Sequence, residues 1–179
     1  MKRSVIQLLV FVSLILSASS VYAQSDPARE KTRERLNALL QREGPTIKVS
    51  FRQSDKNPFN FIGVLKDGLK YAESMEIVIM VSAKDTIGFR VFPHYKGGYI
   101  NIDKVRNTTQ LLRQLVQFNE KTFLFWGADD QGDVFTGYTF TLESGFPDEA
   151  IKIVLASIKN SDQFVGEMRS SIDGGGGAP

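Results

Sequence analysis

The stretch MEIVIMVS (75–82), the link AKD (83–85) and the stretch TIGFRVF (86–92) decide the fold class of this chain. Both stretches are rich in β-branched and aromatic residues, which is typical of strands, and a short link is typical of a hairpin. In the first stretch Ile77, Ile79 and Val81 face one side, whereas Val78 and Met80 face the other. A strand that is apolar on both faces belongs in the middle of a sheet. We therefore expect an antiparallel sheet with this hairpin at its centre.

Further strands are predicted on both sides of this hairpin along the chain. They are expected at 46–52, 59–65, 122–126 and 134–142. In the first of these, Ile47, Val49 and Phe51 alternate strictly with polar residues, which predicts a half-buried strand with one wet face. Pro93 and the pair Gly97-Gly98 are expected to end the central hairpin.

Three helices are predicted from their caps and apolar spacing. The first begins at Asp26-Pro27 and ends at Gly44-Pro45. The second begins at Asn107, where Gln110 completes a capping-box pattern, and it carries a broad apolar face that should be well buried. The third begins at Pro147, and a bend or an interruption is expected at 160–162. The apolar face of the second helix consists of Leu111, Leu112, Leu115, Val116 and Phe118.

The expected order of elements is therefore α-β-β-β-β-α-β-β-α, with hairpins and no regular alternation of strand and helix. Such an order predicts an α+β fold, in which an antiparallel sheet packs against helices.

The ends of the chain differ in composition from its middle. Residues 1–23 have a basic start at Lys2 and Arg3, an apolar core of about 13 residues and the small-residue ending Val21-Tyr22-Ala23, which is typical of a cleavable signal peptide. The core is shorter than a comfortable membrane span of about 20 residues. Because the chain has no cysteine, a lipid anchor on an N-terminal cysteine is excluded. We expect a single domain over 24–172, a flexible Gly-rich tail over 173–179, and a periplasmic or secreted location without a stable membrane anchor.

The charge balance gives no reason to expect a nucleic-acid partner. The whole chain carries 22 basic and 20 acidic residues, for a formal net charge of +2. Lys2 and Arg3 are the only charged residues before Gln24, so the mature chain has equal numbers of both signs. Nucleic-acid binding depends on an excess of positive charge, which is missing here.

The sequence contains no pattern of residues typical of a catalytic site, a metal centre or a cofactor site. The one histidine, His94, cannot build a zinc site by itself, and the chain has no cysteine. The acidic turn 129–133 carries Asp129, Asp130 and Asp133, but it lacks the distal glutamate of an EF-hand and is typical of a solvated hairpin turn. We therefore expect no catalytic residue, metal or cofactor, and we keep a carboxylate enzyme with a divalent ion at this turn as a minor alternative.

The second apolar face of the central strands suggests two functional hypotheses. If the helices cover one face only, the other face is an interaction site for a protein, a peptide or a second copy of the chain. The residues that we expect to form this contact face are Val78, Met80, Phe92, Leu124 and Trp126. Alternatively the helices cover both faces, or Tyr95, Tyr99 and Trp126 surround a pocket for a small ligand or lipid.

Two stretches of the chain resemble the YbjN family, whose fold is similar to that of class I type III secretion chaperones. In the first, 107–133, the run Leu111-Leu112-x-x-Leu115-x-x-Phe118-Asn119 leads into a strand and an Asp-x-x-Gly-Asp turn. In the second, 142–158, a strand ends in a loop and a Pro-Asp-Glu helix start with aliphatic spacing. A looser likeness covers 63–93.

This resemblance implies an α+β fold, often a dimer, and protein binding instead of catalysis. The family has no defined catalytic residues, so none are carried over. Secretion chaperones are cytosolic, whereas this chain has a predicted export signal. The expected function is therefore that of a non-enzymatic protein which binds a protein or peptide partner in the cell envelope, in a chaperone-like or regulatory role.

Overall fold

The computed structural model describes residues 26–174. The expected signal peptide (1–23) and residues 175–179 of the expected tail lie outside this range. None of the helices within it combines the length and the apolar character needed to cross a bilayer.

Seven strands form one antiparallel sheet. Their order across the sheet is β1-β2-β3-β4-β7-β6, and the short β5 pairs with the end of β4. The strands are β1 (Arg52–Gln53), β2 (Asn60–Leu65), β3 (Ser74–Val81), β4 (Thr86–Tyr95), β5 (Gly98–Tyr99), β6 (Phe125–Ala128) and β7 (Val134–Thr141).

The helices follow the expected order, with the third one divided. They are α2 (Pro27–Glu43), the 3-10 helix η1 (Gly44–Ile47), α3 (Thr108–Lys121), α4 (Asp148–Ser157), the 3-10 helix η2 (Ile158–Ser161) and α5 (Asp162–Asp173). The expected interruption near residues 160–162 is confirmed, because η2 separates α4 from α5. Helix α5 extends to Asp173, one residue beyond the expected end of the domain, and Gly174 caps it with a φ of 69°.

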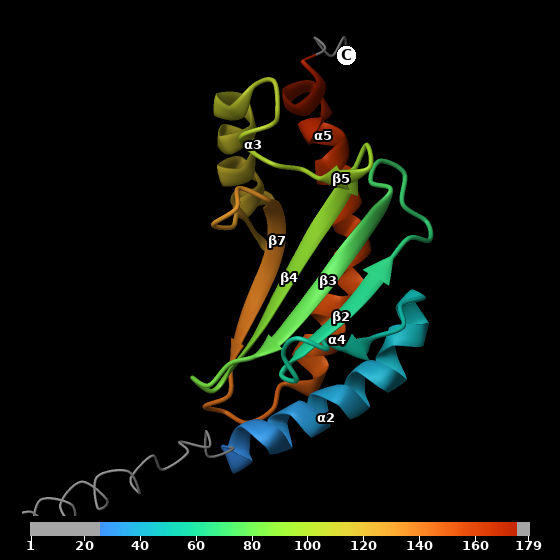
Figure 1. Cartoon of the computed structure of the whole chain (residues 1–179), viewed down its shortest axis with the longest axis vertical. Helices are drawn as coiled ribbons and strands as arrows, with labels where there is room; N and C mark the ends of the chain where they lie inside the picture. Colours follow the sequence, from blue (N-terminus) through green and yellow to red (C-terminus); the bar gives the residue numbers. More distant parts are fainter. Residues whose placement is uncertain (1–25, 175–179) are drawn as a thin grey trace, which may run out of the picture.

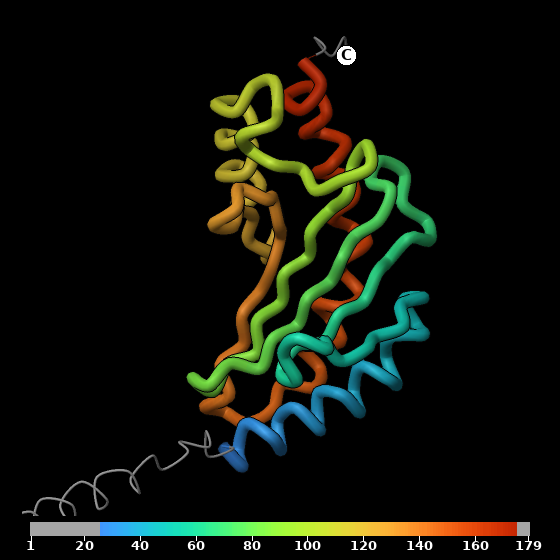
Figure 2. Tube along the Cα trace, viewed as in Figure 1, coloured from blue at the N-terminus to red at the C-terminus, as the bar shows by residue number. Residues whose placement is uncertain are grey.

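The helices gather on one face of the sheet. In Figure 1 the helices α4 and α5 lie behind the strands, α2 crosses their lower end, and α3 stands beside β7 at the upper left. Figure 2 gives the same arrangement of the chain, with none of the described helices passing in front of β3 and β4. The fold is thus an α+β arrangement of one helical layer and one antiparallel sheet, as the order of elements predicted.

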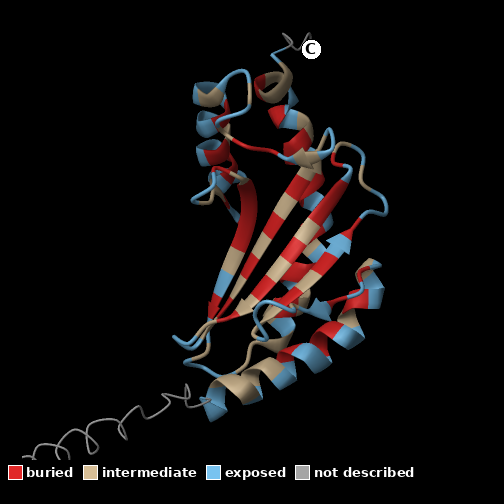
Figure 3. Ribbon diagram, viewed as in Figure 1, coloured by how far each residue is buried: buried red, intermediate tan, exposed pale blue. Residues whose placement is uncertain are grey.

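Burial alternates along the central strands, which identifies the covered face. In β4 every second residue from Ile87 to Pro93 is buried, and the residues between them are half-buried (Figure 3). The buried positions of β3 and β4 belong to the same core as Leu36 of α2, Leu111 of α3 and Val165 of α5. The expectation that the sheet has two apolar faces is confirmed, and the described helices cover one of them.

The predicted strand 46–52 is wrong over most of its length. Residues 44–47 form η1, and Lys48 has a left-handed backbone with a φ of 58°. The N–H of Val49 donates to the carbonyl of Gly44 at 2.9 Å, so it is used in a local turn and not in a sheet ladder. Pairing with β2 begins only at Arg52. The apolar alternation nonetheless corresponds to burial, because Val49 and Phe51 lie in the core.

Pro93 does not end the central hairpin, contrary to expectation. Strand β4 continues to Tyr95, and Gly97 has a φ of 85° in the turn that leads to β5. The pairing of β4 with β7 ends at Val91. Pro93 therefore lies where β4 no longer has β7 beside it, which is a place where a strand tolerates proline.

Capping begins the first two helices as predicted. The Asp26 carboxylate accepts the N–H of Ala28 at 3.0 Å, and Pro27 occupies the first position of α2. The Asn107 side chain accepts the N–H of Gln110 at 2.9 Å at the start of α3. These contacts satisfy amide donors that the helix itself leaves free.

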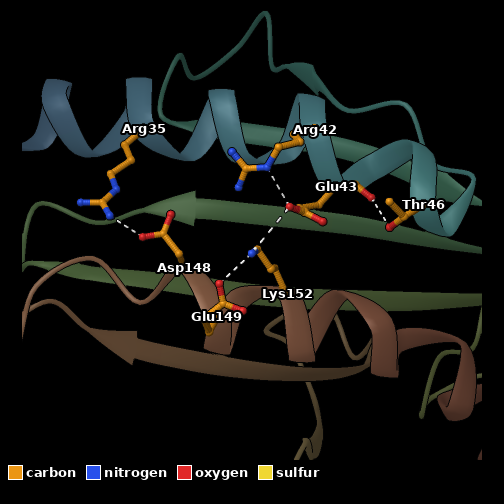
Figure 4. Close-up of polar contacts among 7 residues, drawn as sticks. All are labelled: Arg35, Arg42, Glu43, Thr46, Asp148, Glu149 and Lys152. Atoms are coloured by element: carbon orange, nitrogen blue, oxygen red, sulfur yellow. Dashed lines mark hydrogen bonds and ion pairs between the residues drawn. The ribbon is translucent and has the colours of Figure 1, made fainter.

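Ion pairs join α2 to the start of α4 on the covered side of the sheet (Figure 4). Arg35 pairs with Asp148, and the Glu43 carboxylate lies 2.8 Å from Arg42 and 4.0 Å from Lys152. Lys152 also contacts Glu149 at 2.7 Å. All these groups are at least partly exposed, so they fix the orientation of α2 more than they add to stability.

Fewer residues of the apolar face of α3 are buried than predicted. Leu111, Leu115 and Phe118 are buried, whereas Leu112 and Val116 are exposed. The expectation that all five residues are buried is therefore wrong for Leu112 and Val116. The main packing partners of α3 are β6 and α5, and the side of the helix that carries Leu112 and Val116 is exposed.

Candidate binding surface

The face of the sheet opposite the helices carries a continuous set of large side chains. One row runs across the sheet through the register pairs Ile62–Val78, Val78–Arg90, Arg90–Gly137 and Gly137–Phe125. The neighbouring row on one side contains Val64, Glu76 and Phe92. The neighbouring row on the other side contains Met80. We name this surface the open face, and its large side chains are Ile62, Val64, Val78, Met80, Arg90, Phe92, Tyr99, Phe125 and Phe135.

Aromatic rings occupy the half of the open face next to β6 and β7. The ring centre of Phe92 lies 5.7 Å from that of Phe135 and 5.8 Å from that of Tyr99. Phe125 meets Phe135 edge to face at 5.6 Å. These distances fall in the favourable range for aromatic pairs, so the rings hold one another in place without cover from a helix.

Glycines between the large side chains leave positions of the open face without a side chain. A Cβ added at Gly137 would lie 2.3 Å from the carbonyl oxygen of Phe89 and 3.1 Å from the ring of Phe125. A Cβ added at Gly88 would lie 3.4 Å from the terminal methyl of Met80. Phe125 and Met80 therefore lean over positions that have no side chain, which flattens the surface that a partner would meet.

The open face is charged unevenly. The Tyr99 hydroxyl donates to the Glu76 carboxylate at 3.1 Å. Burial, together with the negative charge of Glu76 and more weakly of Asp133 and Asp129, raises the pKa of Tyr99 to about 12. Near the middle of the face, the guanidinium carbon of Arg90 lies 4.8 Å from the ring centre of Phe135. One end of the face is therefore acidic and its middle is basic.

Three of the five predicted contact residues lie on the open face and two do not. Val78, Met80 and Phe92 lie there and are half-buried. Leu124 and Trp126 are buried in the core, with exposed fractions of 3% and 4%, so the expectation that all five residues share one face is wrong. Trp126 packs between the rings of Phe118 and Phe164, at 5.6 and 5.5 Å.

Sequence reasoning missed Phe125 and Phe135 as members of the open face. Strand alternation predicts that Phe123 and Phe125 lie on the face opposite to Leu124 and Trp126, and the structure separates the two pairs in this way. All four side chains are large and apolar, so residue type alone does not tell which pair faces the helices. The deciding contact is made by Asn119 of α3, whose side-chain amide bonds the N–H and the carbonyl of Trp126 and so fixes α3 beside β6.

The three side chains proposed to surround a ligand pocket do not converge. The Tyr95 hydroxyl donates to Asp173 at 2.8 Å and accepts from the Nε of Arg169 at 3.1 Å, toward the end of α5. Tyr99 lies on the open face, and Trp126 lies in the core beneath α3. The expected pocket between these three residues is therefore wrong.

The acidic turn uses its carboxylates in local hydrogen bonds. Asp129 accepts the N–H groups of Gln131 and Asp133 at 3.0 and 2.9 Å, and Asp133 accepts from the Asn101 amide at 2.8 Å. Gly132, with a φ of 80°, completes the bend. Within residues 26–174 no group of three histidine, aspartate or glutamate side chains is arranged to hold a metal ion.

The lone histidine also belongs to the open side of the sheet. The rings of His94 and Tyr99 are 4.4 Å apart, and the Nε2 atom of His94 is buried with no hydrogen-bond partner among the described residues. A single imidazole without an orienting carboxylate or a neighbouring nucleophile does not make a catalytic group.

Three cavities of the described chain lie away from the open face. One of about 220 Å³ is enclosed by η1, the end of β2 and the end of α4, with Lys48, Asp67 and Lys159 at its rim. A second of about 320 Å³ lies between α2 and the loop around Glu143. A third of about 470 Å³ is a shallow surface hollow along Leu112 and Val116 of α3. None of these three cavities is lined by a residue of the open face.

Comparison with known proteins gives two likenesses of fold. The sequence matches no protein-family model, and no curated protein matches it. Among solved structures, a chain of the ExsC–ExsE complex is 16% identical, with a TM-score of 0.44 over 76% of this chain and 94% of its own. YbjN from E. coli is 13% identical, with a TM-score of 0.49 over 77% of this chain and 91% of its own. At these identities and TM-scores the two likenesses carry no argument about function, and membership of the YbjN family stays a prediction.

Proposed function

We propose that this chain is an exported, non-enzymatic protein of the periplasm that binds a protein or peptide partner through the open face, in a chaperone-like or regulatory role. The observation that carries this proposal is the open face itself. It is an apolar and aromatic surface in the middle of the sheet, left uncovered by every described helix.

Two physical arguments support binding at this surface. Contiguous apolar surface that a monomer leaves uncovered marks interaction sites, because its burial is favourable by about 25 cal/mol per Å². The rings of Phe92 and Phe125 are also held by contacts with Phe135, which is itself buried, so little side-chain freedom is lost when a partner covers them. A flat, ordered surface of this kind suits a protein partner better than a small molecule.

Export rests on residues 1–23, whose basic start, short apolar core and small-residue ending follow the pattern of a signal peptide. The absence of cysteine is compatible with an oxidising compartment, since the fold has no thiol that could be paired wrongly there.

A small-ligand or lipid function has less support than protein binding. Drug-sized ligands usually occupy enclosed cavities of about 300–1,000 Å³. The cavity between η1, β2 and α4 is smaller, at about 220 Å³. The two larger ones, between α2 and the loop around Glu143 and along α3, are more open to the surroundings.

Site-specific photo-crosslinking in living cells tests the proposal. A benzoyl-phenylalanine introduced at Phe125 reports on the open face, and the same group at Ile153 reports on the exposed side of α4. We expect a discrete crosslinked protein from position 125 and none from position 153. Val78→Asp, which places a charge beside Arg90 in the same row, should abolish the product.

Equal products from both positions, or no product from position 125, would contradict binding through the open face. Circular dichroism of the Val78→Asp variant serves as the control, because a folded variant is needed before loss of crosslinking is assigned to the surface.

A further inference from the structure

Arg90 is the basic group at the centre of the open face, whereas Arg52, beside Ile62 at the edge of the sheet, already contacts Asp55 at 3.5 Å. Arg90 lies on β4, with Val78 beside it on β3 and Gly137 beside it on β7. Its guanidinium stacks on the ring of Phe135, which leaves the N–H groups at the edge of the plane available to another acceptor.

This guanidinium has no charged partner within the described chain. Among residues 26–174, Arg90 makes neither an ion pair nor a side-chain hydrogen bond. Its nearest acidic neighbour along the open face, Glu76, stands opposite Phe92 and accepts from the Tyr99 hydroxyl. A half-buried arginine with free donors, surrounded by apolar surface, favours a partner that brings a carboxylate to it.

The charges around Tyr99 restrict how such a partner can lie. Glu76, Asp133 and Asp129 make that end of the face negative, and their charges add to burial, the main cause, in raising the pKa of Tyr99 to about 12. An acidic group is repelled from this end and attracted to Arg90, so the partner has one favoured direction on the sheet.

The shape of the face distinguishes a polypeptide from a small carboxylate. A fatty acid or a metabolite would need a cavity to bury its apolar part, and none of the three cavities is lined by Arg90 or its neighbours. A polypeptide segment can cover a flat surface and place one carboxylate at its centre.

We infer that the open face binds a polypeptide segment in which an aspartate or glutamate, flanked by apolar side chains, forms a paired hydrogen bond with the Arg90 guanidinium while its apolar neighbours cover Val78, Phe92 and Phe125. This inference rests on the proposed function and names the chemistry of its partner.

Selection from a library of random displayed peptides tests the inference, with the protein purified as the cell makes it. We expect the enriched peptides to combine an acidic residue with apolar residues. The best of them should bind Arg90→Glu and Arg90→Gln about 10- to 100-fold more weakly than the unchanged protein, as loss of a charge-assisted pair requires. Arg113→Glu on exposed α3 is the matched control and should bind as the unchanged protein does.

Enrichment of peptides without acidic residues, equal binding to Arg90→Glu, or no enrichment at all would overturn the inference. The variant Phe125→Ala distinguishes a failure of the Arg90 inference from a failure of the proposed function. If peptides lose affinity for Phe125→Ala but not for Arg90→Glu, the open face still binds protein and only the role of Arg90 is wrong. If neither variant matters, the proposed function also fails.

Sedimentation of the purified protein tests a different occupant, a second copy of the chain. A dimer that Arg90→Glu dissociates would mean that a second copy of the chain covers Arg90, and this result would overturn the peptide inference. A monomer, or a dimer that Arg90→Glu leaves intact, supports it.

Discussion

At the scale of single residues, Asp162, at the start of α5, accepts hydrogen bonds from three successive backbone amides. Its carboxylate is buried, with 7% of the residue exposed, and accepts backbone N–H groups from Lys70 at 2.6 Å, Tyr71 at 3.1 Å and Ala72 at 2.8 Å. One side chain thus holds the loop between β2 and β3 against the helical layer. The sequence showed Asp162 only as part of a helix interruption, because its partners lie about 90 residues away.

Replacing this carboxylate should destabilise the fold strongly. We expect Asp162→Ala to lower the free energy of unfolding by about 3 kcal/mol, because three amide donors lose their acceptor in a buried place. Urea unfolding measures the change. Asp130→Ala, at an exposed position of the 129–133 turn, should stay within about 0.5 kcal/mol of the unchanged protein. Equal effects of the two substitutions would contradict the structural role of Asp162.

Asp173 should make the end of α5 sensitive to acid. The hydrogen bond from Lys96, and then that from Tyr95, lower the pKa of Asp173 below its ordinary value of 3.8. A carboxyl whose pKa is lowered on folding stabilises the folded state above its unfolded pKa, and this contribution is lost as the pH falls through the folded pKa. We expect Asp173→Asn to lower the Tm at neutral pH, and the difference from the unchanged protein to shrink progressively as the pH falls below 3.8 toward the folded pKa. A difference that stays constant over this range would contradict the assignment.

At the scale of elements, local patterns predicted most boundaries, and long-range contacts decided the rest. The caps Asp26 and Asn107 and the central hairpin were predicted because their signals depend on residues within one turn of each other. The strand expected at 46–52 failed for a physical reason. Val49 and Phe51 are buried and Ile47 is half-buried, as in a strand, but a hydrogen bond within the η1 turn uses the backbone donor of Val49.

Close contact between β4 and β7 depends on the absence of a side chain at Gly137. A methyl group there would lie 2.3 Å from the Phe89 carbonyl oxygen, so the strands would have to separate. We expect Gly137→Ala to cost about 1–3 kcal/mol in urea unfolding. Gly98→Ala, where an added Cβ meets nothing within 4 Å, is the matched control and should be nearly neutral. If Gly137→Ala left the free energy of unfolding unchanged, the two strands would be less tightly packed than described.

At the scale of the whole molecule, the sequence predicted two apolar faces of the sheet but could not assign them to helices. Trp126 and Phe125 are neighbours with similar chemistry, and only the packing of α3 and α5 places one in the core and the other on the open face. The same limit explains why Arg90 was not predicted as a binding residue. Its significance comes from the ring of Phe135 beneath it, which belongs to another strand.

Export is a property of the whole chain and has a direct test. We expect the protein recovered from bacterial periplasm to begin at Gln24, because cleavage after Val21-Tyr22-Ala23 fits the small-residue pattern of signal peptidase. Intact mass of the purified protein measures this. Full-length chain retained in the cytosol would contradict export, and it would leave binding by the open face to be tested in that compartment.

The central claim, that a partner covers the open face in the cell, is tested most directly by cysteine labelling, since the chain has no cysteine of its own. Single cysteines at Val64 or Phe125 report on the open face, and one at Ile153 reports on exposed α4. We predict that a maleimide reacts with the first two several-fold more slowly in cells than in the purified protein, whereas position 153 reacts equally in both. Equal labelling at all three positions in cells and in purified protein would contradict the claim.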